Sequence, residues 1–216
     1  LQNVYTTKNV SEQGLSLALC VTEAFLSGTG AAWRVHGGGF AGTIQAFVPV
    51  ELAAKYSDIY DMLIDMKELE LTGLSEQDTA RIGEKLGEGL FPGAFIALYG
   101  GLGAGKTTLT RSIAAALGIR GILSPTFTIV REYAGRIPLF HFDAYRLGDA
   151  DELYAIGFDE YMARGGAIIM EWCENVEDAL PFDRLEIHIQ GSGEEPRSMR
   201  IAASGAAHEK LMEGLA

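Results

Sequence analysis

The chain has 216 residues and a formal net charge of -12, from 17 Lys and Arg against 29 Asp and Glu. A protein this acidic is poorly suited to binding nucleic acid by itself, because a phosphate backbone is bound by Lys and Arg, while its 48% hydrophobic content excludes wholesale disorder. Its two cysteines, Cys20 and Cys173, indicate neither a metal cluster nor a disulfide framework, and no apolar run approaches the ~20 residues of a membrane span, so we expect a cytoplasmic protein without membrane contact.

The sequence divides into two blocks near Met66, of which the first is the smaller. Within residues 1–65, helical patterns cover Ser11–Leu26 and Glu51–Tyr60, and an apolar strand is expected at Thr43–Val48. The glycine run Gly37–Gly42 precedes that strand. We therefore expect a small α+β segment, followed by a larger domain over residues 66–216.

The second block begins with an amphipathic helix over Ser75–Leu90. The four residues from Ser75 to Asp78 read Ser-Glu-Gln-Asp and resemble a capping box in which Asp replaces the usual Glu. Apolar residues then recur every four positions, at Ile82, Leu86 and Leu90, which is the spacing of one helix face.

Helix and strand patterns alternate along the rest of the second block. Helices are expected at residues 106–117, 150–162 and 208–215, and strands at residues 94–99, 137–142, 167–172, 184–190 and 199–203. Strands and helices alternate early, and the strands crowd together late. This order predicts an α/β fold, with a mixed sheet flanked by helices in which parallel strands are joined by an antiparallel edge.

The most informative stretch is Gly100–Thr107, which reads G-G-L-G-A-G-K-T. It matches the P-loop pattern G-x-x-x-x-G-K-[ST] at every fixed position and lies between an expected strand and an expected helix. Glycines let backbone N–H groups turn inward and form a nest for anions with the helix N-terminus. We expect these residues to bind a nucleoside triphosphate: Gly103, Ala104, Gly105, Lys106, Thr107 and Thr108. Lys106 would reach the β- and γ-phosphates and Thr107 would ligate Mg²⁺, whereas the alternative is a turn that only joins two elements.

Two carboxylates follow expected strands of the same domain. Asp143 comes at the end of one apolar run and Glu171 at the end of the next. Because ligands gather at the carboxyl ends of parallel strands, both are candidates for holding Mg²⁺ or for polarising the attacking water. Position alone is equally compatible with a loop or cap residue at Asp143 and a surface residue at Glu171.

Three further residues could contribute to this site. The turn-rich segment Ser124–Thr128 connects the loop's helix to the next strand, so Thr126 could sense the nucleotide, although a plain β-turn is the simpler interpretation. His141 would share one side of a strand with Asp143. Trp172 could pack against a base or a ribose. A core position is the simpler interpretation of both aromatic residues.

These motifs resemble the TsaE family, the small ATPases of bacterial tRNA threonylcarbamoyladenosine synthesis, from about Glu68 to the end of the chain. The fold expected from the resemblance is that of a P-loop NTPase. Where the family usually has Pro after Glu-Trp, this chain has Cys173, which alters the exit of that loop. The resemblance rests on Ser75…Thr79, the Gly100–Thr108 loop, Ser124-Pro125-Thr126-Phe127, His141-Phe142-Asp143-Ala144-Tyr145-Arg146-Leu147, Gly157-Phe158-Asp159-Glu160-Tyr161 and Glu171-Trp172.

The resemblance implies a role for each matching residue. Lys106 and the loop backbone would bind the phosphates of ATP, Thr107 and Glu171 would ligate Mg²⁺, and Asp143 would act with them in metal binding and hydrolysis. Thr126 would belong to a switch-like segment, Thr79 would lie near the base, and Trp172 would support the site. The resemblance also implies TsaD-like and TsaB-like partners, with tRNA met only through their complex.

The first block resembles a different family. The stretch Trp33–Gly42 is similar to the third glycine-rich motif of galactokinases, and Asn9–Leu15 also fits the C-terminal region of that family. Residues 1–65 therefore resemble the C-terminal end of a galactokinase. Such a fragment can hardly phosphorylate galactose alone. Two other functions stay open: a small-molecule kinase acting on a sugar or nucleoside, and a nucleotide-gated binding module in which hydrolysis is incidental.

Overall fold

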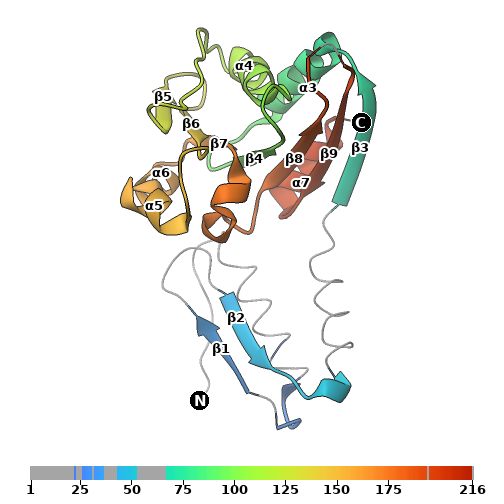
Figure 1. The fold of residues 1–216 in the computed structure, drawn as a ribbon, viewed down its shortest axis with the longest axis vertical. Coiled ribbons are helices and arrows are strands. Elements are labelled where there is room, and N and C mark those ends of the chain that lie inside the picture. Colours follow the sequence, from blue (N-terminus) through green and yellow to red (C-terminus); the bar gives the residue numbers. More distant parts are fainter. Residues whose placement is uncertain are drawn as a thin grey trace. The chain divides into compact units, whose positions relative to one another are not determined.

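The computed structural model describes residues 22, 26–30, 32–36, 43–52, 67–193 and 195–215. The chain separates into two compact units, Leu1–Asp65 and Met66–Ala216. In the first unit, β1 (Ala32–His36) and β2 (Thr43–Phe47) form an antiparallel pair. The glycine run at residues 37–42 and most of the two helices expected there lie outside the described residues, drawn as a thin grey trace in Figure 1.

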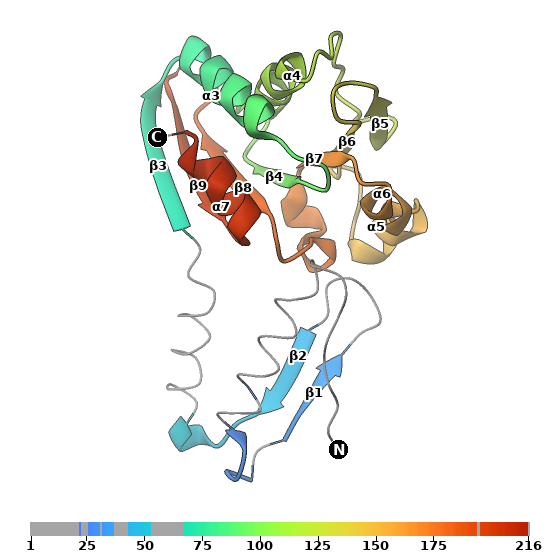
Figure 2. The same cartoon turned by 180° about the vertical axis from the view of Figure 1, so that it is seen from behind.

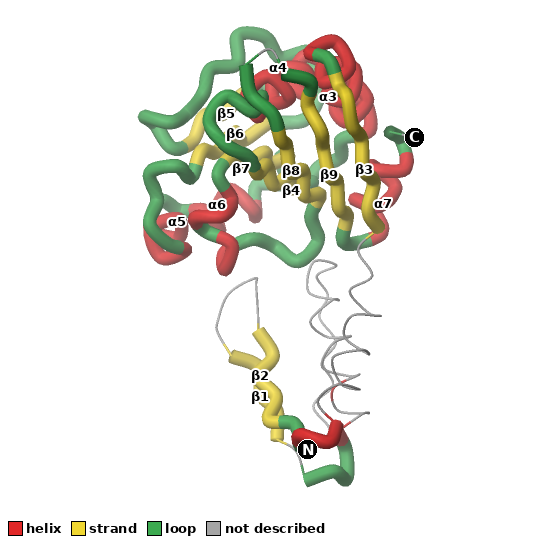
Figure 3. Tube along the Cα trace, turned by 45° about the vertical axis from the view of Figure 1, so that its right-hand side comes forward, coloured by secondary structure: helices red, strands yellow, loops and turns green. Residues whose placement is uncertain are grey.

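A seven-stranded mixed sheet forms the centre of the second unit (Figure 1). Its strands lie in the order β3-β9-β8-β4-β7-β6-β5. β8, β4, β7 and β6 run parallel, whereas β9 and β3 on one side and β5 on the other run antiparallel to their neighbours. Figure 3 shows β8, β9 and β3 side by side at one end of the sheet. The sheet is therefore of the mixed α/β type that the sequence predicts. The bounds are Lys67–Leu74 for β3, Phe95–Tyr99 for β4, Val130–Tyr133 for β5, Leu139–Asp143 for β6, Ala167–Glu171 for β7, Leu185–Gln190 for β8 and Arg197–Ala203 for β9.

Helices cover both faces of this sheet. Successive residues of β4 point to opposite faces, so that Ile96 and Leu98 join one hydrophobic core and Phe95 and Ala97 join a second. The first core is closed by three helices visible in Figure 2, which are α3 (Glu76–Gly89), α4 (Lys106–Ala116) and α7 (Ala206–Glu213). The second is closed by α5 (Ala150–Ala155), α6 (Phe158–Ala163) and two 3-10 helices, η2 (Cys173–Asn175) and η3 (Glu177–Ala179).

Helix α3 begins as its sequence predicts. Ser75 is the N-cap, and its Oγ accepts a hydrogen bond from the N–H of Asp78 at 3.2 Å. The Asp78 carboxylate accepts one from the N–H of Ser75 at 3.0 Å. The two residues thus satisfy each other's backbone donors, which confirms the capping box.

Two glycines let α3 approach α4 closely. A Cβ added at Gly83 would lie 2.5 Å from Cβ of Ser112, and one added at Gly87 would lie 2.4 Å from the carbonyl oxygen of Ile113. Because Cβ atoms do not tolerate such distances, a side chain at either position would push the helices apart. Helix α4 carries the residues that follow Gly105, so this contact also sets the position of the loop before it.

Two features of the second unit differ from the sequence-based expectation. The helix expected over residues 150–162 is broken into α5 and α6, because Gly157 between them has a φ of 81° and serves as the N-cap of α6. The edge strands β3 and β5, which pair with β9 and β6, are not evident in the sequence pattern. Among the described residues, no helix combines the length and the apolar character that crossing a membrane requires.

Candidate functional site

The glycine-rich loop (Gly100–Thr107) joins the carboxyl end of β4 to the start of α4. Gly100 has a φ of 140°, and a Cβ there would lie 2.5 Å from the carbonyl oxygen of Ile189, so only glycine fits. Gly105, with a φ of 109°, is the N-cap of α4 and supplies no side-chain hydrogen bond. The first N–H groups of α4 are therefore uncapped by a side chain, which is the arrangement that binds an anion.

Lys106 folds back over this loop. Its Nζ donates to the carbonyl oxygens of Gly100 and Gly101, the second at 3.0 Å, and lies 3.8 Å from the ring centroid of Trp172. Burial lowers the pKa of the Lys106 ammonium, while nearby carboxylates, Glu171 foremost, oppose that shift. The positive charge is thus held at the mouth of the loop, between carbonyl dipoles and an aromatic face.

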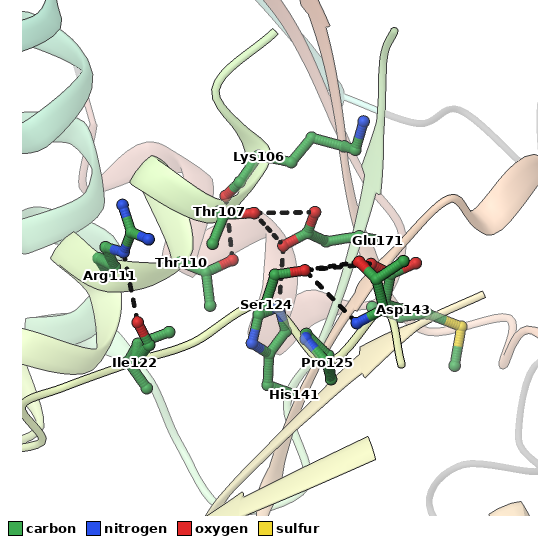
Figure 4. A network of polar contacts seen from close by, with 12 residues as sticks. Lys106, Thr107, Thr110, Arg111, Ile122, Ser124, Pro125, His141, Asp143 and Glu171 are labelled. Atoms are coloured by element: carbon green, nitrogen blue, oxygen red, sulfur yellow. Dashed lines mark hydrogen bonds and ion pairs between the residues drawn. The ribbon is translucent and has the colours of Figure 1, made fainter. Parts of the chain in front are cut away.

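Thr107 and Glu171 meet directly (Figure 4). The Thr107 hydroxyl donates to Glu171, with Oγ1 2.9 Å from Oε1 and 3.2 Å from Oε2. Glu171 ends β7, is 3% exposed, and also contacts Nε2 of His141 at 2.9 Å. The buried His141 comes from β6. Two strands and the first turn of α4 thus bring a hydroxyl, a carboxylate and an imidazole together.

Asp143 ends β6 beside Glu171, and the two are register partners across the parallel pair β6 and β7. Its Oδ2 accepts a hydrogen bond from the Thr126 hydroxyl and one from the Ser124 hydroxyl at 3.4 Å, and these two hydroxyls lie 2.7 Å apart. Its Oδ1 accepts the backbone N–H of Tyr145 at 2.9 Å. The nearly buried carboxylate therefore holds both the segment Ser124–Thr128 and the chain that follows β6.

Two cavities adjoin the glycine-rich loop. The smaller measures about 230 Å³, and its walls include Lys106, Thr107, Asp143 and Glu171. The larger measures about 540 Å³ and lies between the loop, the start of α3 and the segment before β9. The loop separates the two spaces, because four residues line both: Gly103, Ala104, Gly105 and Thr108.

Thr79 and Arg197 lie at the larger cavity. Thr79 is 3% exposed and donates its hydroxyl hydrogen to the carbonyl of Ser75 at 3.1 Å. Arg197 begins β9 and donates from Nε to the carbonyl of Ala104 at 2.9 Å and from Nη2 to the carbonyl of Gly193 at 2.9 Å. Arg197 thus ties the segment before β9 to the glycine-rich loop, a contact that no sequence pattern indicates.

Comparison with known proteins identifies the family. A family model described as threonylcarbamoyl adenosine biosynthesis protein TsaE matches residues 74–199, which is more than half of the chain. The chain belongs to the TsaE family. A curated relative, the tRNA threonylcarbamoyladenosine biosynthesis protein TsaE of Bacillus subtilis, is 40% identical over 152 residues, covering 69% of this chain and 95% of the relative. The protein of the same name from Treponema pallidum is 38% identical over 129 residues, covering 59% and 96%.

A solved structure agrees with this assignment. The crystal structure of YdiB from Bacillus subtilis matches with a TM-score of 0.60 and 36% identity, over 69% of this chain and 95% of that one. The sequence resemblance to the TsaE family is therefore confirmed, and the chain belongs to a family that takes part in threonylcarbamoyladenosine synthesis in tRNA. The galactokinase resemblance of residues 1–65 stays a prediction.

The structure places the TsaE-type site residues at both cavities. Thr79 lines the larger cavity together with the loop. Trp172 contacts Lys106 and the ring of Tyr145, with the Trp172 and Tyr145 ring centroids 4.9 Å apart, and its packing against a base stays a prediction. The smaller cavity is lined by the remaining predicted residues, Gly103, Ala104, Gly105, Lys106, Thr107, Thr108, Thr126, Asp143, Glu171 and Trp172.

Two contacts within the site were missed by sequence reasoning. His141 is buried, as a core residue would be, but it is bonded to Glu171, and its spacing of two residues from Asp143 was the one available signal. Ser124 joins Thr126 at the Asp143 carboxylate, and its place in the motif Ser124-Pro125-Thr126-Phe127 was the available signal.

The smaller cavity suits a Mg²⁺ ion that arrives with phosphates. Within the described part of the chain, no group of three or more His, Cys, Asp or Glu side chains could hold a metal by itself. Mg²⁺ needs fewer protein ligands, because it keeps several waters and takes substrate phosphates as ligands beside one or two carboxylates. The Thr107 hydroxyl and the Glu171 carboxylate supply adjacent oxygen atoms of the kind that Mg²⁺ prefers.

Proposed function

We propose that this TsaE-family protein is a Mg²⁺-dependent ATPase required to form the threonylcarbamoyl group on adenosine 37 of tRNA, acting with TsaD-like and TsaB-like partners. The observation that carries the proposal is the contact between Thr107 and Glu171, next to a loop with the phosphate-binding pattern. Family membership supports the pathway, and this contact supports the chemistry.

ATP would lie across the glycine-rich loop. Its phosphates would accept hydrogen bonds from the N–H groups of the loop and of the first turn of α4. Lys106 would exchange the carbonyl oxygens of Gly100 and Gly101 for the β- and γ-phosphates. The cavity of about 540 Å³ on the far side of Gly103–Gly105 offers room for the nucleoside, with Thr79 in its wall.

Thr107 and Glu171 would hold Mg²⁺, which would neutralise charge on the β- and γ-phosphates. Asp143 would act beside them, because it lies at the same sheet edge as Glu171. Its hydrogen bonds to Ser124 and Thr126 hold the segment Ser124–Thr128 at the smaller cavity. Thr126 would then respond to the γ-phosphate, and Asp143 would reach the metal or the attacking water through this segment.

Charge and exposure support the proposed partners. The net charge of -12 favours an indirect encounter with tRNA, because an acidic surface repels a phosphate backbone. Leu102 lines the smaller cavity and is 88% exposed. Phe127 follows Thr126 of its lining and is 84% exposed, and Tyr145 packs against Trp172 of its lining and is 55% exposed. Exposed apolar residues that gather in one region mark protein contacts, so a partner protein would meet this region.

Phosphate release from ATP tests the proposed chemistry. The full chain with Mg²⁺ should hydrolyse ATP weakly alone and at a different rate with its partners, and Lys106→Ala should abolish nucleotide binding. A parallel incubation with ATP and galactose tests the kinase alternative, and we expect no sugar phosphate. Formation of galactose phosphate, or undiminished hydrolysis by Lys106→Ala, would contradict the proposal.

A further inference from the structure

His141 is a buried imidazole in an otherwise apolar layer of the sheet. It lies in the middle of β6, two residues after Leu139, and its register partner in β7 is Ile169. Leu139 and Ile169 both belong to the core that faces α4, and His141 is 0% exposed. Burying a polar ring in such a layer costs free energy unless hydrogen bonds compensate it. A purely structural position there would be filled as well by an apolar side chain.

The compensating partner of His141 is Glu171. Nε2 lies 2.9 Å from Oε1, and the two side chains are 0% and 4% exposed. Nδ1 is buried and has no hydrogen-bond partner among the described residues. Because an ionised carboxylate only accepts hydrogen bonds, Nε2 is the donor in this contact. The single hydrogen bond of this ring is therefore directed at one carboxylate oxygen.

Glu171 needs such an anchor to hold one orientation. The Thr107 hydroxyl has one hydrogen and lies within 3.2 Å of both carboxylate oxygens, so it does not by itself distinguish them. His141 contacts Oε1 alone and thereby removes that ambiguity. We propose that His141 is the positioning residue that orients Glu171, so that Oε2 and the Thr107 hydroxyl are presented together to Mg²⁺. This inference rests on the proposed function, because it concerns the same Mg²⁺ site.

Two polar variants of His141 separate the hydrogen bond from simple occupancy of the site. The amide nitrogen of glutamine lies as many bonds from Cβ as Nε2 does, so His141→Gln keeps a donor for Glu171. Asparagine places its amide at the Nδ1 position, so His141→Asn loses that donor while it stays polar and buried. If His141 had only a structural role, the two variants would have similar Mg²⁺ requirements. If His141 positions Glu171, the Mg²⁺ requirements of the two variants should differ.

The first experiment measures the affinity of the full chain for a fluorescent ATP analogue as the Mg²⁺ concentration is varied. Groups that orient a metal ligand contribute about 10- to 100-fold to metal affinity. His141→Asn should therefore need a Mg²⁺ concentration at least about 10-fold higher to bind the nucleotide as the wild type does. His141→Gln should resemble the wild type, and affinity without Mg²⁺ should be unchanged in both. An unaltered Mg²⁺ requirement in His141→Asn, or an equal loss of metal-free affinity in both variants, would overturn the positioning role. If the affinity of the wild type for the ATP analogue did not depend on Mg²⁺, the Mg²⁺ site itself would be overturned, and the inference with it.

A second experiment requires no variant of His141 to fold. The chain has four histidines, so nitrogen NMR spectra of the imidazole rings of the wild-type protein can resolve each one. We expect His141 to carry a proton on Nε2. The opposite tautomer would place no donor on Glu171 and would overturn the inference.

Discussion

Asp143 and Glu171 lie directly opposite each other at the carboxyl ends of two neighbouring parallel strands. Both carboxylates are nearly buried, and each accepts a hydrogen bond from a different threonine, Thr126 for Asp143 and Thr107 for Glu171. Glu171 is thereby joined to the glycine-rich loop, and Asp143 to the segment Ser124–Thr128. The two residues occupy equivalent places in the sheet but connect to different parts of the site.

Removing the Glu171 carboxylate should separate nucleotide binding from turnover. Glu171→Ala leaves Lys106 and the loop backbone in place, so ATP affinity at saturating Mg²⁺ should fall little. The rate of hydrolysis should fall by roughly 100-fold, the scale on which removing a single group that supports the charge of the transition state lowers a rate. Calorimetric titration and phosphate release measure the two quantities, and Lys106→Ala serves as the control that loses binding. Intact hydrolysis by Glu171→Ala would show that its assigned role is wrong.

Trp172 fluorescence should report the binding of ATP. The Lys106 ammonium lies 3.8 Å from the Trp172 ring centroid, and a move toward bound phosphates would change the surroundings of that ring. The chain has two tryptophans, so Trp33→Phe leaves Trp172 as the emitter. Its emission should change on addition of ATP, and Lys106→Ala in the same background should show no change. Constant emission from Trp33→Phe at saturating ATP would argue against movement of Lys106.

The contact between α3 and α4 should not tolerate a methyl group at Gly87. Its Cβ would lie 2.4 Å from the carbonyl oxygen of Ile113, and overpacking of this kind costs about 1–3 kcal/mol. Alanine regains up to about 1 kcal/mol of helix propensity, so Gly87→Ala should lower the free energy of unfolding by about 1 kcal/mol. Gly148→Ala, outside the helices, is the control for a methyl group added without a clash, because its Cβ would approach no atom closer than 3.8 Å. Equal stabilities of the two variants in urea would contradict the packing argument.

Stability should fall in mild acid because of His208. Its Nε2 accepts the backbone N–H of Phe95 at 3.1 Å, and burial lowers its pKa from 6.5 to about 4. Between these two values the unfolded chain binds a proton that the folded chain does not. This contribution to stability is therefore complete above pH 6.5 and is lost as the pH falls to 4, in total about 3 kcal/mol.

The variant His208→Gln isolates this effect. Glutamine keeps an acceptor for the N–H of Phe95 but does not titrate, so its unfolding free energy should vary less between pH 6.5 and 4 than that of the wild type. Denaturant unfolding across this range gives both curves. Parallel curves for the two proteins would assign the acid sensitivity to other groups.

Features fixed by local sequence were predictable. The N-terminus of α3 follows from Ser75 and Asp78, which cap each other within one turn. The strand before Gly100 and the helix after Gly105 follow from the loop pattern, which requires both. The placement of Asp143 and Glu171 at one sheet edge follows from the rule for the ends of parallel strands.

Features that depend on distant pairing were not predictable. Leu69 of β3 pairs with Ile201 of β9, and no local pattern reveals that partner. Arg197 reaches the carbonyl of Ala104 because β9 and the segment before it bring it there. The contact of His141 with Glu171 requires two strands to be adjacent and in register, which periodicity alone does not determine.

Multiple-turnover formation of threonylcarbamoyladenosine on tRNA is the measurement that tests the proposed function most directly. The reaction is run with TsaD-like and TsaB-like partners, ATP and Mg²⁺, with and without the full chain. We predict that the chain increases the product over several turnovers and that Lys106→Ala does not. Equal amounts of product with and without the chain, after several turnovers, would contradict the proposed role.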